Sequence, residues 1–422
     1  MPWERGIRAN IGQFGLQILT VFSVGLTMGA ERNIVPIMGE ELFGIDSVLV
    51  IGSFVVSFGL VKAVLNLYAG KWADTYGRRP VLIAGWLVAL PIPFILMYAP
   101  SWAWVAAGNV LLGINQGVAW SMSMVSKIDL ARNEERGLAV GLDEAFGYTG
   151  VAIGAWLTGV IAAEYSLRPE PFYLLLLVII IGTLLALFFI KDTLPLAQAE
   201  AEASAATADA DLSFGEVVRL ASYEDRTLFA AAQAGHVENF VDTLVWIAFP
   251  LFLVAQGLDT AQVGVVVGVH SAAYFLQVYT GRLGDQIGRK PPIVAGFFLA
   301  GAGILGMVLV ESYAAWIALS ALAGVGMALH YPNLITVVSD AAHPRWRSTG
   351  LGVYRLWRDL GYAVGAILIG LLVDFGSMHI AFVGTAVAMF ISGAYVAVRM
   401  EETHPRFGTH PATVARRTSS SS

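Results

Sequence analysis

The chain of 422 residues is 57% hydrophobic and only 13% charged, whereas about a quarter of the residues in a soluble domain are charged. It contains no cysteine, which excludes disulfides, thiolate metal sites and cysteine nucleophiles. The formal net charge of −6 comes partly from an acidic central segment and indicates little about partners. The composition therefore predicts a protein embedded in a lipid bilayer.

Long apolar runs follow one another along the whole chain. A helix needs roughly 20 apolar residues to cross a bilayer core of about 30 Å, and twelve runs meet this requirement. We expect spans near residues 14–37, 47–69, 81–99, 102–126, 137–163, 172–190, 228–254, 261–281, 292–310, 313–339, 348–374 and 379–399. The first run lacks the pattern of a signal peptide, so we expect it to be retained.

Two segments outside these runs are polar. Residues 191–227 should form a cytoplasmic linker, because Ala197 to Asp211 is rich in Ala, Glu and Asp. Apolar residues after that stretch are spaced for a short amphipathic helix on the membrane surface; they are Phe214, Val217, Val218 and Leu220. We therefore expect halves at 1–190 and 228–400, joined by the linker, and a disordered cytoplasmic tail at 401–422.

One loop occurs twice. Its first copy contains Gly70, Asp74, Gly77, Arg78 and Pro80. The same residue types recur 211 positions later, as Gly281, Asp285, Gly288, Arg289 and Pro291. Each copy lies between two apolar runs, so an offset of half the chain length predicts a duplicated block of membrane helices. The glycines permit a tight reversal, and the aspartate is suited to a helix N-terminus.

Basic residues indicate the orientation. If the repeated loops are cytoplasmic, 20 of the 25 Lys and Arg residues lie in cytoplasmic segments and only Arg168 lies outside the cell. The opposite orientation contradicts the positive-inside rule. We therefore expect a multi-pass protein of the inner (cytoplasmic) membrane, with both termini in the cytoplasm.

The pattern G-x-x-x-D-x-x-G-R-[RK]-P, found twice in a six-plus-six helix chain, resembles the signature loop of the major facilitator superfamily. The resemblance covers about residues 12–400. It implies two pseudo-symmetric six-helix bundles around a cavity lined by helices 1, 4, 7 and 10. Helices 2, 5, 8 and 11 then form the contacts between the halves, and the bundles rock to give alternating access.

The resemblance also assigns the repeated loops a gating role. In an outward-facing state Asp74 should approach the N-terminus of helix 11, and Asp285 that of helix 5. Two departures weigh against an efflux protein. Asn109 occupies the position where many proton-driven members carry an arginine, and Val151 follows Gly150 where export-type members carry proline.

Charged residues inside spans are costly and usually face the bundle interior. Glu144 has no basic neighbour in its own span, and desolvation favours its neutral form, so we expect it to carry a proton. Asp242 and Asp359 are the other proton-coupling candidates. The offset of 211 relates Glu144 to Arg355 and Glu31 to Asp242.

Polar residues of the spans expected around the cavity are candidate substrate contacts: Asn115, Gln116, His236, Asn239, Tyr354, Trp357 and Arg358. Alternatives remain open. The polar residues of helix 7 form either a proton ladder or a packed network, and Glu31 and Arg32 serve an outer gate or reach the interface. Lys127 is expected to be solvated. We expect no metal at the histidines.

Lys62 and Asp359 form the most specific predicted pair. They lie on helices 2 and 11 at similar depths, roughly 12 and 13.5 Å from the cytoplasmic boundary, so opposite charges there should attract across the halves. In the alternative, Lys62 extends to the interface and Asp359 pairs with Arg355 within the helix.

The leading hypothesis is a secondary active transporter for a small molecule or ion, coupled to protons. No Walker-type loop is present, and no residue set indicates an enzyme. A non-transporting sensor and a passive facilitator on the same fold remain alternatives; within transport, drug or metabolite efflux competes with small-anion movement. We expect a monomer in the lipid bilayer without cofactor or nucleic-acid partner.

Overall fold

The computed structural model describes residues 5–132, 135–197, 199, 212–342, 347–404 and 406–410, and all regular elements in these ranges are helical. Eleven helical stretches are long and apolar enough to cross a membrane. A twelfth consists of α7 (Trp102–Asn115), the π-turn η1 (Gln116–Trp120) and α8 (Ser121–Leu130), which follow one another without a break. The described residues thus contain the twelve expected spans.

The first half of the chain forms six of these spans. Besides α7–η1–α8, its elements are α1 (Ile11–Arg32), α2 (Ile34–Glu41), α3 (Val48–Ile51), α4 (Ser53–Tyr76), α5 (Arg78–Ala89), α6 (Ile92–Tyr98), α9 (Arg136–Glu164) and α10 (Glu170–Phe188). The span of α5 and α6 is interrupted near Pro91, because proline lacks the N–H that an uninterrupted helix requires.

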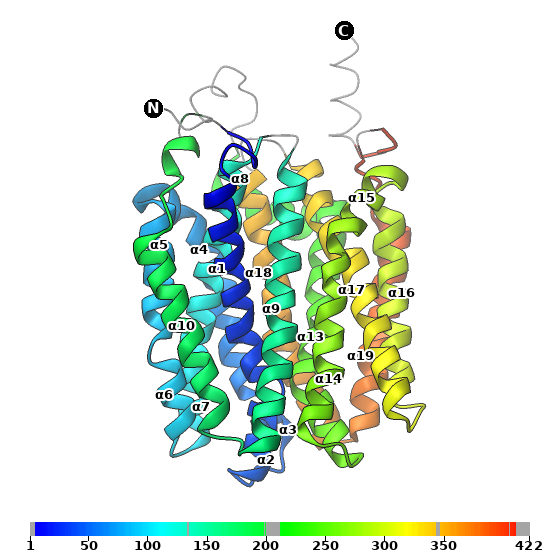
Figure 1. The fold of residues 1–422 in the computed structure, drawn as a ribbon. Coiled ribbons are helices and arrows are strands. Elements are labelled where there is room, and N and C mark those ends of the chain that lie inside the picture. Colours follow the sequence, from blue (N-terminus) through cyan, green and yellow to red (C-terminus); the bar gives the residue numbers. More distant parts are fainter. Residues whose placement is uncertain are drawn as a thin grey trace.

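The second half repeats this arrangement. Its elements are α13 (Arg226–Ala255), α14 (Thr260–Ala272), η4 (Ala273–Leu276), α15 (Gln277–Ile287), α16 (Lys290–Met307), α17 (Tyr313–Ala341), α18 (Arg347–Asp374) and α19 (Met378–Arg399). Figure 1 shows the two halves side by side, with the start of α1 and the end of α19 at the same end of the molecule. We call this end the terminal side and the opposite end the far side.

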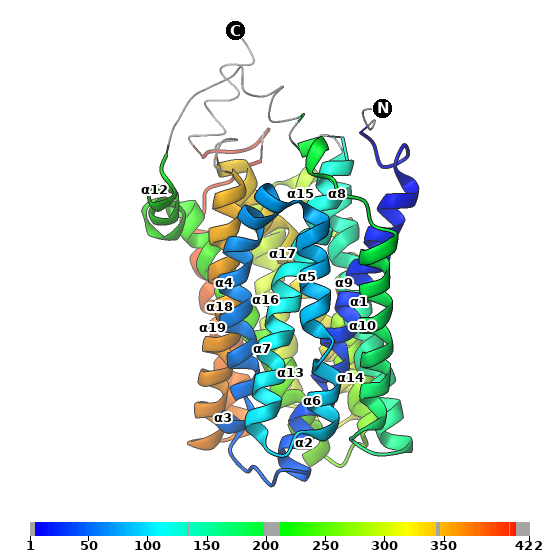
Figure 2. The ribbon, with the colours of Figure 1, turned by 90° about the vertical axis from the view of Figure 1, so that its left-hand side faces the viewer.

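A short helix precedes the second half, as the amphipathic pattern predicts. Helix α12 (Phe214–Arg219) begins with a capping box between Ser213 and Glu216 and continues into the π-turn η3 (Leu220–Glu224). Figure 2 shows α12 beside the bundle near the terminal side. Residues 198 and 200–211, and the tail beyond His410, lie outside the described residues, so the predicted disorder of the linker and tail remains a prediction.

Candidate functional site

The repeated loops have the same backbone geometry. Gly77 and Gly288 have φ values of 97° and 96°, a conformation that glycine adopts most readily. The carboxylate of Asp192, just after α10, accepts hydrogen bonds from the backbone N–H groups of Arg78 and Arg79 at 3.2 and 3.3 Å. An acid after the last helix of the half therefore caps α5.

The second loop repeats this cap and reveals a further pair. Glu402, just after α19, accepts from the N–H groups of Arg289 and Lys290 at 2.9 and 3.0 Å. The Arg289 side chain lies 3.3 Å from Asp340. In the first half, Arg78 lies 3.0 Å from Asp129, which is 211 residues before Asp340. The same offset in the sequence was the signal that could have identified this pair.

The predicted latch cannot be located in the structure. The side chain of Asp74 and those at the start of α9 and α18 lie outside the described residues. The Asp285 carboxylate is exposed and lies 2.5 Å from Arg289 of its own loop. The approach of Asp74 and Asp285 to helices of the other half therefore remains a prediction.

A small cavity lies between the halves. Residues of both halves line it: Met28, Lys62, Asn66, Trp120, Ser121, Glu144, Tyr148, Tyr331, Arg355, Arg358, Asp359 and Tyr362. The lining combines aromatic rings with charged groups, a composition typical of small-molecule sites, where a few polar groups orient a ligand among apolar surfaces.

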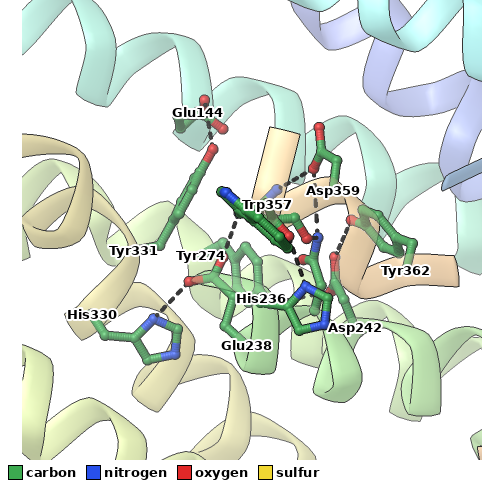
Figure 3. Close-up of polar contacts among 12 residues, drawn as sticks. Glu144, His236, Glu238, Asp242, Tyr274, His330, Tyr331, Trp357, Asp359 and Tyr362 are labelled. Carbon is green, nitrogen blue, oxygen red and sulfur yellow. Dashed lines mark hydrogen bonds and ion pairs between the residues drawn. The ribbon is translucent and has the colours of Figure 1, made fainter. Parts of the chain in front are cut away.

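Glu144 lines this cavity from α9. Its side chain is 3% exposed, and Tyr331 of α17 donates a hydrogen bond to Oε1 at 3.3 Å; Figure 3 shows the two groups facing each other. It forms no ion pair with a described residue, although Arg355, Arg358 and Lys62 interact with it electrostatically. A carboxyl group in this position can take up or release a proton without breaking an ion pair.

Arg358 is held by protein groups on three sides. Its Nε lies 2.6 Å from Glu238 Oε1 and its Nη1 lies 3.0 Å from Asp359 Oδ1. Its guanidinium lies 4.2 Å from the centre of the Tyr331 ring, a cation–π contact. Arg358, a predicted substrate contact, is therefore bound by Glu238 of α13 and by Asp359 of its own helix.

Lys62 lies 3.7 Å from Asp359, between Nζ and Oδ1. Asn66, one turn along α4, also donates a hydrogen bond to the Asp359 carboxylate. Arg355 does not pair with Asp359; its Nη2 lies 2.6 Å from Met124 Sδ, and no ion pair joins it to a described acid. Asp359 therefore joins α18 to α4. In this structure Lys62 does not extend to the membrane interface, and Asp359 does not pair with Arg355.

A second pair between the halves was not predicted. Arg32 of α1 donates two hydrogen bonds to Asp242 of α13, at 3.2 and 3.0 Å, and both side chains are buried. The hydroxyl groups of Tyr274 and Tyr362 donate to the same carboxylate at 3.2 and 2.6 Å. The alternative that Glu31 and Arg32 reach the membrane interface is wrong, because both are fully buried.

Several predicted substrate contacts do not line the cavity. Asn115 donates to Gly85 O at 3.1 Å, and Gln116 donates to Val24 O at 2.9 Å. Both amides therefore hold the span of α7 and α8 against its neighbours in the first half. In this structure they are packing residues, because Asn115 contacts α5 and Gln116 contacts α1.

Trp357 also lies away from the cavity. It is 36% exposed and donates to Ser222 of η3 at 2.8 Å, while its carbonyl oxygen lies 2.8 Å from His236 Nδ1. Two helical positions correspond to about 200°, so Trp357 faces outward when Arg355 faces inward. Asn239 of α13 and Tyr354 of α18 are also buried, and the Asn239 side chain donates a hydrogen bond to Arg358 O at 2.7 Å.

Lys127 is fully buried, which corrects the expectation that it is solvated. Its Nζ lies 2.6 Å from Asp143 and donates to Gln17 O and Ser123 Oγ at 2.9 and 2.7 Å. The span continues to Leu130, so Lys127 points into the bundle between α1 and α9 instead of ending at the surface.

The halves pack more closely towards the far side. A Cβ atom on Gly264 would lie 3.1 Å from Ala155 O, and one on Gly159 would lie 2.8 Å from Thr260 O. Towards the terminal side, a Cβ on Gly141 would lie 3.8 Å from Val278 Cα. Small residues therefore permit close backbone contact between α9 and α14 at the far side, and the Arg32–Asp242 pair lies on the same side of the cavity.

The comparisons with known proteins agree with this arrangement. The model of the Major Facilitator Superfamily matches residues 19–234 and 234–421. The uncharacterized MFS-type transporter YddS of Bacillus subtilis (strain 168) is 25% identical over 373 residues, 86% of this chain and 85% of the relative. The multi-drug resistance efflux pump PmrA homolog of Lactococcus lactis subsp. lactis (strain IL1403) is 23% identical over 353 residues, 80% and 82% of the two chains.

Two further proteins are similar over most of the chain. The class E tetracycline resistance protein of Escherichia coli is 24% identical over 334 residues, 77% of this chain and 78% of the relative. The crystal structure of the human organic anion transporter MFSD10 (TETRAN) has a TM-score of 0.69 at 15% identity and covers 92% of this chain and 99% of that chain. At this identity the likeness shows the fold alone.

Proposed function

The chain belongs to the Major Facilitator Superfamily, and from this we propose that it is a proton-coupled secondary transporter that moves a small organic solute by alternating access. Orientation follows from the basic residues: the terminal side is cytoplasmic and the membrane is the inner one. The relatives named as multidrug and tetracycline resistance proteins support an organic solute. We propose a monomer, because the cavity lies within one chain.

Proton coupling is supported by one observation, the state of Glu144. It is the cavity-lining carboxyl group without an ion pair among the described residues, whereas Asp359 is paired with Lys62 and Arg358. Asp242 is less suited to carry a proton, because Arg32 and two tyrosines stabilise its ionised form. A buried carboxyl group that changes charge between the two open states couples proton movement to transport.

The substitution Glu144→Gln tests this role. The variant keeps the shape of the neutral side chain but cannot release a proton, so it should exchange solute across the membrane without accumulating it. The measurement is uptake into proteoliposomes with and without an imposed pH gradient, using a solute identified by a thermal-stability screen of metabolites, ions and drugs.

Glu170→Gln is the matched control, because Glu170 is half-buried at the start of α10 and does not line the cavity. It should accumulate solute like the unsubstituted protein. Accumulation by Glu144→Gln at the normal level would refute the assignment. Equilibration of the unsubstituted protein without any response to the gradient would indicate a passive facilitator, and binding without movement would indicate a sensor.

A further inference from the structure

All but two of the charged side chains that line the cavity form ion pairs with oppositely charged residues. Lys62 and Arg358 contact Asp359 at 3.7 and 3.0 Å, and Arg358 also contacts Glu238 at 2.6 Å. Two bases are thus matched by two acids. The remaining charged groups on the cavity wall are Glu144 and Arg355.

Arg355 is half-buried and carries a full charge without an acidic partner among the described residues. Its contact with Met124 Sδ, at 2.6 Å from Nη2, offers only a weak acceptor. An unpaired guanidinium inside a membrane protein is costly and usually serves a ligand or an ion pathway. Its flat fork of donors matches a carboxylate or sulfonate group.

Glu144 and Arg355 occupy matched positions in the duplicated halves, 211 residues apart. Glu144 is eight positions after Arg136, where α9 begins, and Arg355 is eight positions after Arg347, where α18 begins. By helix rise both lie about 12 Å from the helix start. The duplication has therefore placed an acid and a base at the same depth on the two halves of one cavity.

We propose that the solute is an organic monoanion whose acidic group binds Arg355 and which is carried together with the proton on Glu144. This inference rests on the proposed transport function. With Glu144 ionised, three acids (Glu144, Glu238 and Asp359) balance the three bases of the cavity. With Glu144 protonated, one positive charge is left over on Arg355, and an anion fits.

Other charged groups near Glu144 do not change this balance. Asp143, its neighbour in α9, is paired with Lys127 at 2.6 Å, and Arg32 is paired with Asp242 at 3.0 Å. His330 faces Glu238 at 3.2 Å, and His270 faces Asp242 at 3.9 Å. The bases that act on Glu144 are Arg355, Arg358 and Lys62, and the last two are paired with Asp359. The protonation of Glu144 therefore sets the net charge that a solute meets.

The direction of coupling follows from this charge balance. Proton and anion stabilise each other in the cavity and are carried in the same direction. A cation would instead compete with the proton and favour exchange. The rings of Trp120, Tyr148, Tyr331 and Tyr362 and the side chain of Met28 line the rest of the wall, which suits a solute with an apolar or aromatic body.

Three ligands with the same phenyl body and different charges test the proposal. They are benzenesulfonate, benzenesulfonamide and benzamidinium, which are anionic, neutral and cationic. Binding is measured by calorimetry on the purified full-length protein in nanodiscs at acidic and at alkaline pH. The proteins are the unsubstituted chain, Arg355→Gln, Arg355→Lys, Glu144→Gln and the control Arg219→Gln, which changes an exposed arginine of α12.

Benzenesulfonate should bind more tightly at acidic than at alkaline pH and about tenfold or more tightly than the other two ligands. Arg355→Gln should weaken its binding by about tenfold or more, the loss of one charge-assisted contact. Arg355→Lys should recover part of that loss. Glu144→Gln should bind it with the same affinity at both pH values, and Arg219→Gln should behave like the unsubstituted protein.

Preference for benzamidinium, absence of benzenesulfonate binding, or an unchanged affinity in Arg355→Gln would each overturn the anion assignment. The proposed function fails separately. If Glu144→Gln still accumulates solute under a pH gradient, proton coupling through Glu144 is wrong whichever ligand binds. If accumulation is lost but the solute is a cation, proton coupling stands and the anion assignment is wrong.

Discussion

Only glycine fits at positions 77 and 288, because the backbone there has a positive φ and a Cβ atom would collide with a neighbouring carboxylate. Their φ values of 97° and 96° lie in a region that side chains with a Cβ rarely adopt. A Cβ on Gly77 would overlap the carboxylate of Asp192, and one on Gly288 would lie 2.6 Å from Glu402 Oε2. The same glycine therefore permits the turn and makes room for the acid that caps the next helix.

Gly77→Ala should lower the thermal unfolding temperature in detergent. The strained backbone alone costs about 1 kcal/mol or more, and displacement of Asp192 removes the cap on α5. Gly215→Ala is the control, because no atom lies within 4 Å of a Cβ built at that helical position. Equal unfolding temperatures for the two variants would contradict this account of the loop.

The side chains of the spans show where residue-level reasoning succeeds and fails. Counting residues placed Lys62 and Asp359 at similar depths, and their side chains lie 3.7 Å apart. Trp357 and Lys127 were assigned to the wrong surroundings, because their placement depends on helix rotation and on where the span ends. Neither quantity can be obtained from hydropathy alone.

Two buried ion pairs connect helices of the first half to helices of the second half. Lys62 of α4 meets Asp359 of α18, and Arg32 of α1 meets Asp242 of α13. Removing one member of such a pair leaves an uncompensated charge, which typically costs 3–5 kcal/mol when the site is buried. The pairs therefore hold the halves together in this state and must rearrange if the halves rock apart.

Exchanging the charges of Lys62 and Asp359 tests the first pair. Lys62→Asp and Asp359→Lys should each lose transport, and the double variant should regain part of it, since opposite charges again face each other. Recovery should be incomplete because Arg358 and Asn66 also contact Asp359. Uptake into proteoliposomes is the measurement.

A control exchange of Arg219 and Glu224 should leave transport unchanged, because this pair is exposed at the terminal side. The pair between α4 and α18 would lose its proposed role if the double variant were no better than the worse single variant. Loss of protein from the membrane, checked by the amount purified, would instead indicate a folding defect.

At the scale of the whole molecule, the far side is the more tightly packed. Close backbone contacts between α9 and α14, and the Arg32–Asp242 pair, lie on that side of the cavity. We expect an alternate state in which these contacts separate and the terminal side closes. The repeated loops, which lie at the terminal side, would then approach the opposite half.

Gly264→Leu should shift the protein towards that alternate state, because a side chain there meets Ala155 O. The chain has no cysteine, so Ser121→Cys provides a single reporter on the cavity wall. A membrane-impermeant maleimide added at the far side should label it faster in the Gly264→Leu background. Gly15→Leu is the control and should leave the labelling rate unchanged, because no atom lies within 4 Å of a Cβ at Gly15. Equal labelling rates of Ser121→Cys with and without Gly264→Leu would refute the proposed closure of the far side.

The sequence by itself determined the twelve spans, their duplication and the family. Each of these rests on a pattern that is local or strictly periodic: a run of apolar residues of bilayer length, or a motif repeated at one offset. The proximity of Lys62 and Asp359 could be inferred for a similar reason, because counting residues from the boundary gives depth, and facing helices were known from the resemblance.

Only the tertiary structure decided which side chains meet. The partners Arg32 and Asp242 are 210 residues apart, and their contact depends on the tilt and rotation of α1 against α13. The same two quantities place Trp357 outside the cavity and Arg355 inside it. Hydropathy indicates that a helix is buried, but the direction of each side chain is set by packing against helices distant in the chain.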